Sequence, residues 1–432
     1  MNGHGQSRRG GVERGGDACI ALGGRTLPSA RAMQASPPLR DQASITASFR
    51  YVIEPICALL LANDILPLGP SSLMEGQIGQ GICATRAFVR EEQGSRDCCA
   101  QLKIQEKKVG FTRKLVTTSL AVGGAVGVLA LYNKFTESQV SEPDTVLKGE
   151  ERRYPWKYGD IFYQVKGSRD AKPLLLIHGL VPGASSFEWR KNVDALAERF
   201  RVYTLDLLGF GLSDRPGIDY TAETFADLIS DFVKEAIGKP TVVVAHGLTS
   251  AYVIADAYRR PQLFERLVLV SPPPAILQES VPGPLNNALK FVLRTPVLGQ
   301  FVYDVLTSRR AIRAYYDSQG YQNPGLITDE LVEYAYSSAH QPNSLYPAAS
   351  FISNNLTMDA HEPLARLQMP IVAIWGREEV FTPIETSDAF KSVNAGIDVR
   401  ILEKARQQLQ DEQAGKFNAL VSEFAGATVA QQ

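Results

Sequence analysis

Short apolar runs alternate with amphipathic stretches over residues 151–425. This rhythm predicts a mostly parallel sheet that is covered by helices on both faces. Ile161–Val165 is expected to form an early antiparallel strand. Further strands are expected at Pro173–Ile177, Val202–Leu205, Leu267–Val270, Ile371–Trp375 and Asp398–Leu402. The apolar periodicity predicts helices at Glu188–Phe200, Thr224–Ile237, Glu385–Ser392 and Asp411–Phe424. The expected fold class is therefore α/β, with a doubly wound sheet.

The stretch Val242–Tyr252 interrupts this rhythm with a pattern that carries chemistry. A β-branched run ends in small residues and leads directly into a helical sequence. A nucleophile elbow has this form: a sharp strand–turn–helix, with the pattern G-x-S-x-G, that raises a catalytic side chain above a sheet. Here Gly247 stands at the place of the nucleophile. We therefore expect the elbow without its nucleophile.

The sheet rhythm stops between Ser271 and about Leu367. The intervening segment, Ile276–Arg366, is helical or irregular in pattern, and prolines mark its start. We expect it to form a helical cap, at about residues 276–366, inserted over the carboxyl edge of the sheet. Its aromatic residues suggest an apolar site between cap and sheet; they are Phe291, Phe301, Tyr303, Tyr315, Tyr316, Tyr334 and Tyr336.

The first hundred residues have the composition of a leader. Residues 18–40 contain Arg25, Arg31 and Arg40 and no acid, with Ser, Ala and Pro between them. Organelle transit peptides have this composition, so residues 1–100 are predicted to be a targeting or disordered leader. Plain disorder or a misassigned start are the alternatives.

A hydrophobic segment follows the leader. Leu115–Tyr132 has no charge over eighteen residues, which corresponds to roughly 27 Å of helix, close to a bilayer's hydrocarbon thickness. A hydrophobic helix within residues 111–135 is predicted to be a single membrane anchor, or alternatively a second, cleavable targeting signal. Gly123 and Gly127 have the spacing of a close helix–helix contact. The polar residues 136–150 are expected to be a linker.

Composition narrows the list of partners. The net charge of −1 and the lack of a basic stripe with interleaved aromatics give no reason to expect a nucleic-acid partner. The five cysteines all lie in the first hundred residues, and none has metal-ligand spacing with a histidine. No metal ion and no cofactor are therefore expected.

Several motifs in this order resemble the α/β-hydrolase superfamily over about residues 151–425. They are His178-Gly179, Asp206–Pro216, Val242–Gly247, Trp375–Glu379 and Phe417-Asn418. The loop Asp206–Pro216 and the cap stretch His340–Asn343 are similar to capped members from plastids and photosynthetic bacteria. Together with the leader and the hydrophobic segment, this resemblance predicts a membrane-associated protein of the chloroplast, with the mitochondrion as the alternative.

The resemblance also assigns the catalytic positions of a serine hydrolase, which needs a nucleophile, an acid-oriented histidine and an oxyanion hole. Gly247 takes the nucleophile position and Glu379 the acid position. Gln407 takes the histidine position, with Gln410 as the alternative. The backbone amides of Leu180 and Leu248 take the oxyanion-hole positions. A glutamine cannot accept a proton near neutral pH, so this triad is predicted to be degenerate.

Other residues could supply chemistry in place of the triad. His246 and Ser250 are the alternative catalytic candidates. His246 is expected first as a packing residue, and Ser250 and Thr249 are expected to face elsewhere. His340 and His361 are expected to be structural. The main hypothesis is a non-catalytic protein that binds an apolar small ligand or a protein partner. The alternative is an ester or C–C bond hydrolase, or a lyase, with altered catalytic residues, and a third reading is a relic of an active relative.

Overall fold

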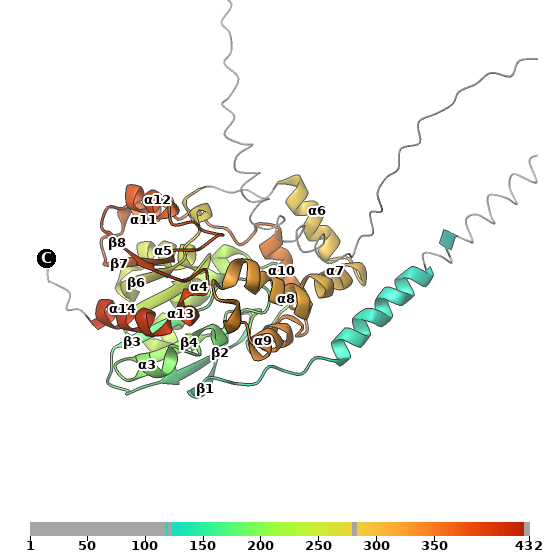
Figure 1. The fold of residues 1–432 in the computed structure, drawn as a ribbon, viewed down its shortest axis with the longest axis horizontal. Helices are drawn as coiled ribbons and strands as arrows, with labels where there is room; N and C mark the ends of the chain where they lie inside the picture. The colour runs from blue at the N-terminus through green and yellow to red at the C-terminus, as the bar shows by residue number, and fades with distance from the viewer. Residues whose placement is uncertain (1–117, 120–122, 279–282, 427–432) are drawn as a thin grey trace, which may run out of the picture. The chain divides into compact units, whose positions relative to one another are not determined.

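An eight-stranded sheet organises the chain, in the order β1-β2-β4-β3-β5-β6-β7-β8 (Figure 1). The computed structural model describes residues 118–119, 123–278 and 283–426. β2 runs antiparallel to β1 and β4, and all other neighbours are parallel. The strands are β1 Glu150–Trp156, β2 Gly159–Lys166, β3 Pro173–Ile177, β4 Arg201–Leu205, β5 Thr241–His246, β6 Phe264–Val270, β7 Ile371–Gly376 and β8 Ile397–Leu402.

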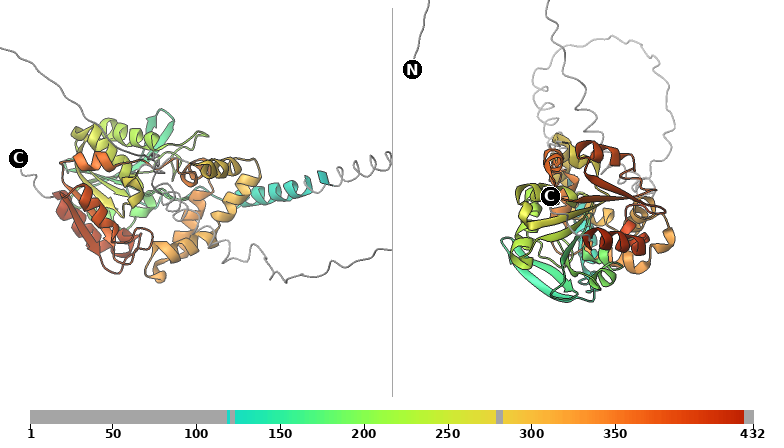
Figure 2. Two further views of the ribbon diagram at one scale, coloured as in Figure 1. Left: turned by 90° about the horizontal axis from the view of Figure 1, so that it is seen from above. Right: turned by 90° about the vertical axis from the view of Figure 1, so that its left-hand side faces the viewer.

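Alternate residues of the central strands pack into two separate hydrophobic cores, one on each face of the sheet. Leu175 and Ile177 of β3 pack toward α4 (Ala222–Phe232), η2 (Val233–Ile237), α5 (Thr249–Arg259), α11 (His361–Arg366) and α12 (Thr386–Val393). Leu174 and Leu176 pack toward α3 (Val193–Ala197), α13 (Leu409–Glu412) and α14 (Ala414–Gly426). Helices therefore cover both faces of the sheet (Figure 2), which confirms the predicted doubly wound α/β fold.

The cap lies between β6 and β7 in the sequence. Its elements are η4 Pro274–Leu277, α6 Pro284–Leu293, α7 Leu298–Leu306, α8 Arg309–Tyr315, η5 Tyr316–Gly320, η6 Pro324–Leu326, α9 Asp329–Ala339 and α10 Leu345–Ile352. Phe187, in the loop after β3, stacks on Tyr334 of α9 with ring centroids 4.0 Å apart. Tyr252 Oη of α5 donates to the Leu356 carbonyl at 2.5 Å. These contacts fix the cap on the sheet domain.

One predicted helix is wrong in its extent. Instead of Glu188–Phe200, the chain forms a short 3₁₀ turn, η1 (Ser186–Trp189), and then the five-residue α3. Asn192 separates the two, and its buried Nδ2 donates to the Gln410 carbonyl and to Asn418 Oδ1. A side-chain amide that must reach these two acceptors holds the backbone away from a continuous helix.

The N-terminal predictions lie largely outside the described residues. This holds for the leader at residues 1–100 and for residues 115–117 and 120–122 of the predicted anchor. The described part contains a helix over residues 123–138, which includes Lys134 and Glu137. Among the described residues no helix has the length and apolarity needed to cross a bilayer. The anchor at Leu115–Tyr132 stays a prediction. The chloroplast and mitochondrial locations stay predictions.

Candidate functional site

The nucleophile elbow forms at the carboxyl end of β5. Gly247 follows the last residue of the strand, has φ +60°, and is followed by α5 two residues later. Its N–H donates to the Val270 carbonyl at 2.8 Å. A Cβ built on Gly247 would have no atom within 4 Å. The structure therefore keeps the left-handed turn of an elbow and leaves open the space where a side chain would stand.

Glu379 lies just beyond β7 and is buried. Ser271 Oγ donates to Glu379 Oε2 at 2.6 Å, and Thr382 Oγ1 donates to Oε1. Burial raises the pKa of Glu379 from 4.5 to about 7, although both hydroxyls and the nearby His246 act in the opposite direction. The predicted acid position is thus an enclosed carboxyl that titrates near neutrality.

The predicted histidine position is occupied by an amide that the cap holds in place. Gln407 Oε1 accepts a hydrogen bond from Tyr315 Oη of α8 at 2.6 Å. The alternative position, Gln410, is fully buried, and its Nε2 donates to Glu188 Oε1 at 3.2 Å and to Gln408 Oε1 at 3.0 Å. Both glutamines are held by hydrogen bonds, and neither can act as a general base.

The structure pairs His246 with an acid that sequence reasoning missed. His246 Nδ1 lies 2.7 Å from Glu188 Oε1, and the two side chains are only 4% and 9% exposed. Burial alone would lower the pKa of His246, but the charge and hydrogen bond of Glu188, followed by the charge of Glu379 and the Gln407 backbone, raise it above 6.5. His246 is therefore half of a buried ion pair beside the elbow.

Glu188 also reaches the loop after β3. Its Oε2 accepts the Gly179 N–H at 3.1 Å. Within the described residues, the amides of Leu180 and Leu248 donate to no protein acceptor. An oxyanion hole needs backbone amides without an internal acceptor, and the assignment of Leu180 and Leu248 to it stays a prediction.

The remaining candidates have their polar atoms committed elsewhere. Ser250 Oγ donates to the Ala245 carbonyl at 3.2 Å and Thr249 Oγ1 to the His178 carbonyl at 2.9 Å; both residues are fully buried. His340 lies in the cap, where its Nδ1 is 2.9 Å from the Tyr336 carbonyl and its ring stacks on the Tyr336 ring. Neither the Ser250 hydroxyl nor the Thr249 hydroxyl points at the open space beside Gly247.

The loop that follows β4 is fixed by its own aspartate. Asp206 Oδ1 accepts the Ser186 N–H at 2.6 Å, and Oδ2 accepts the Leu212 N–H at 2.8 Å. A Cβ on Gly211, which has φ +52°, would stand 2.1 Å from Asp206 Oδ2. Glycine at this position is therefore a structural requirement.

An eight-stranded, mostly parallel sheet with an elbow after β5 and an inserted cap defines a class of α/β proteins that place their site at the carboxyl edge of the sheet. Residues 172–414 match the family described as alpha/beta hydrolase fold. The chain belongs to this family.

Similar sequences and similar solved structures agree with membership of this family. An uncharacterized protein from Mycobacterium bovis is 27% identical over 62% of this chain and 78% of its own length. A 2-hydroxymuconate semialdehyde hydrolase from a Pseudomonas species is 25% identical over 58% of this chain and 86% of its own length. The structure is similar to that of a meta-cleavage product hydrolase from Pseudomonas fluorescens, with TM-score 0.52 and 25% identity, over 64% of this chain and 97% of the other.

Proposed function

We propose that this chain is a non-hydrolysing member of the family that binds an apolar small molecule between cap and sheet. The observation that carries the proposal is the elbow at Gly247. It retains the φ of +60° and open space for a side chain, but it supplies no nucleophile. Losing a triad nucleophile or base lowers turnover by on the order of 10⁶, and here glycine and glutamine take the two predicted positions.

The surroundings of Gly247 support binding without hydrolysis. Tyr315 is fixed on Gln407 by a hydrogen bond of 2.6 Å, which couples the cap to the place where a catalytic histidine would stand. An amide held in this way orders the wall of a site but cannot move a proton. The alternative is that the protein, likewise without catalysis, binds a protein partner on its surface in place of a small molecule.

A ligand screen tests the proposal. The purified chain is heated with a panel of fatty acids, terpenoids and aromatic acids, and the melting temperature is recorded. Gly247→Asn places a side chain in the open space, and asparagine tolerates a positive φ. Gly238→Asn is the matched control, because Gly238 has φ +70° and its nearest Cβ neighbour is the Lys234 carbonyl oxygen at 3.9 Å.

A ligand that raises the melting temperature of the wild type and of Gly238→Asn, but not of Gly247→Asn, supports the proposal. The proposal is rejected if no compound shifts the wild type, or if the wild type hydrolyses short or long acyl esters at enzymatic rates.

A second candidate function is acid–base chemistry without a covalent intermediate, such as ester or C–C bond hydrolysis through water, or a lyase reaction. Two buried groups favour it. His246 is paired with Glu188 at 2.7 Å, and the pKa of Glu379 is raised by burial to about 7, where a general acid or base works best at neutral pH. Perturbed groups gathered in this way are common at active sites.

This candidate makes a different prediction for mutants. Turnover of an acyl ester or of 2-hydroxymuconate semialdehyde should be lost in His246→Gln and in Glu379→Gln. It should persist in Ser250→Ala, because the Ser250 hydroxyl is bonded to Ala245. Loss of turnover in Ser250→Ala alone would contradict both functions.

A further inference from the structure

A second polar site lies at the opposite edge of the sheet from the elbow. A cavity of about 320 Å³ opens where β3 and β4 begin, and Pro173 and Arg201 line it. These two residues are register partners at the amino ends of their strands. His246, by contrast, ends β5 at the carboxyl edge. The cavity is therefore separate from the capped site.

One helix, η2, ends beside the cavity. η2 covers one face of the sheet and ends at Ile237, where Gly238 takes a left-handed conformation with φ +70°. The cavity is bordered by Ile237 and Lys239 on one side and by Arg201 and Tyr203 of β4 on the other. Residues two apart on a strand share a face, so the Arg201 and Tyr203 side chains both stand on the face that α4 and η2 cover. Tyr203 is buried there, whereas Arg201 is partly exposed.

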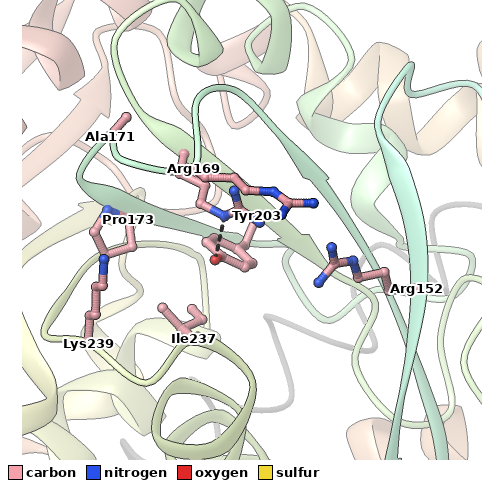
Figure 3. A pocket seen from close by; sticks show the side chains of 8 residues that line it. Arg152, Arg169, Ala171, Pro173, Tyr203, Ile237 and Lys239 are labelled. Atoms are coloured by element: carbon pink, nitrogen blue, oxygen red, sulfur yellow. Dashed lines mark hydrogen bonds between the residues drawn. The ribbon is translucent and has the colours of Figure 1, made fainter.

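Cations dominate the lining. Arg152, Arg169, Arg201 and Lys239 all border the cavity, and no acidic residue does (Figure 3). Among the described residues, the side chains of Arg169 and Lys239 have neither a hydrogen bond nor an ion pair. Positive charges this close together repel one another, which destabilises the empty protein.

One arginine is already oriented. Arg201 Nε donates to Tyr203 Oη at 2.8 Å, drawn as a dashed line in Figure 3. This bond fixes the plane of the guanidinium and leaves its two terminal nitrogens for another acceptor. A preoriented guanidinium loses less freedom when it binds an oxyanion.

Three of the four cations also act on a nearby carboxylate, that of Glu150. Glu150 on β1 pairs with Arg152 Nη2 at 2.7 Å. The hydrogen bond from Arg152, with the charges of Arg152, Arg169 and Arg201, lowers the pKa of Glu150. Glu150 offsets one of the four cations at the edge of the cavity, so an excess of positive charge remains inside it.

We propose that this cationic cavity binds a ligand with two linked phosphate groups. A single phosphate carries about −1.5 to −2 at neutral pH, less than the excess positive charge, whereas a diphosphate comes closer to balancing it. Guanidinium groups fit phosphate oxygens in paired hydrogen bonds. The diphosphate group could belong to a soluble metabolite or to a phosphorylated lipid headgroup, and both would present the same oxygens.

Calorimetric titration of the full chain with inorganic pyrophosphate tests the proposal, and flotation with phosphatidylcholine vesicles containing a bisphosphorylated inositol lipid distinguishes the source. Arg169→Glu and Lys239→Glu alter exposed side chains and should each weaken binding about tenfold or more, as expected for a lost charge-assisted hydrogen bond. Arg310→Glu, an exposed arginine on α8, is the matched control and should leave the affinity unchanged.

Pyrophosphate binding that depends on Arg169 and Lys239 supports a soluble ligand, and vesicle binding with the same dependence supports a lipid. The proposal is overturned if neither probe binds at physiological salt, if only an acidic peptide binds, or if Arg310→Glu weakens binding as much as the two cavity variants do.

Discussion

Replacing Glu379 by glutamine should change how the stability of the protein depends on pH. Burial raises the pKa of this carboxyl from 4.5 to about 7. A raised folded-state pKa gives stability that is fully present below pH 4.5 and is lost as pH rises through about 7. Each pKa unit is worth about 1.36 kcal/mol, so the loss amounts to about 3 kcal/mol.

Glutamine copies the protonated carboxyl in size but does not titrate. At pH 5, Glu379→Gln should therefore lie within about 1 kcal/mol of the wild type, since its amide oxygen still accepts one of the two hydroxyls. Between pH 5 and pH 8, the difference in unfolding free energy between the variant and the wild type should shift by about 3 kcal/mol in favour of the variant. The free energy of unfolding is measured by urea denaturation of the full chain from pH 5 to pH 8.

Glu330→Gln, at an exposed position on α9, is the control and should follow the wild-type profile. A difference between Glu379→Gln and wild type that stays constant from pH 5 to pH 8 would refute the reasoning, because it would mean that Glu379 is ionised throughout and in contact with solvent.

Two further predictions concern stability. Glu188→Gln should lose about 2–3 kcal/mol, because a buried ion pair loses one partner. Since the pKa of His246 is raised above 6.5, this loss should be largest below pH 6.5 and shrink as pH rises through the folded-state value; a penalty that grows with pH would contradict the pairing. Gly211→Ala should lose about 3 kcal/mol or more in urea denaturation, since its Cβ would stand 2.1 Å from Asp206 Oδ2. Gly415→Ala in α14 has nothing within 4 Å of the new Cβ and should cost nothing; equal losses in the two variants would remove the steric explanation.

The sheet could be predicted from the sequence because its central strands are buried on both sides. The limits of β3 are those expected, since Pro173–Ile177 is apolar throughout and every residue is buried. β1 was not predicted, because Glu150–Trp156 is a polar edge strand in which only Tyr154 is buried. Its place depends on pairing with β2, which no local pattern reveals.

The sequence indicated candidate positions for the site but none of their contacts. The order of motifs located Gly247, Glu379 and Gln407, and their catalytic assignment stays a prediction. Glu188 had no signal of its own, because it was expected only as the first residue of a continuous helix, Glu188–Phe200. Its pairing with His246 arises only when the 3₁₀ turn at Ser186–Trp189 faces the end of β5. Such long-range pairs depend on the tertiary fold.

Covalent labelling tests the central claim, the vacant nucleophile, most directly. The purified chain is incubated with a serine-reactive fluorophosphonate, and its intact mass is measured beside that of the double variant Gly247→Ser/Gln407→His. A serine at φ +60° costs about 1–2 kcal/mol of strain, which leaves a folded protein. The account predicts no adduct on the wild type and a single adduct on the double variant. A stoichiometric adduct on the wild type would contradict it.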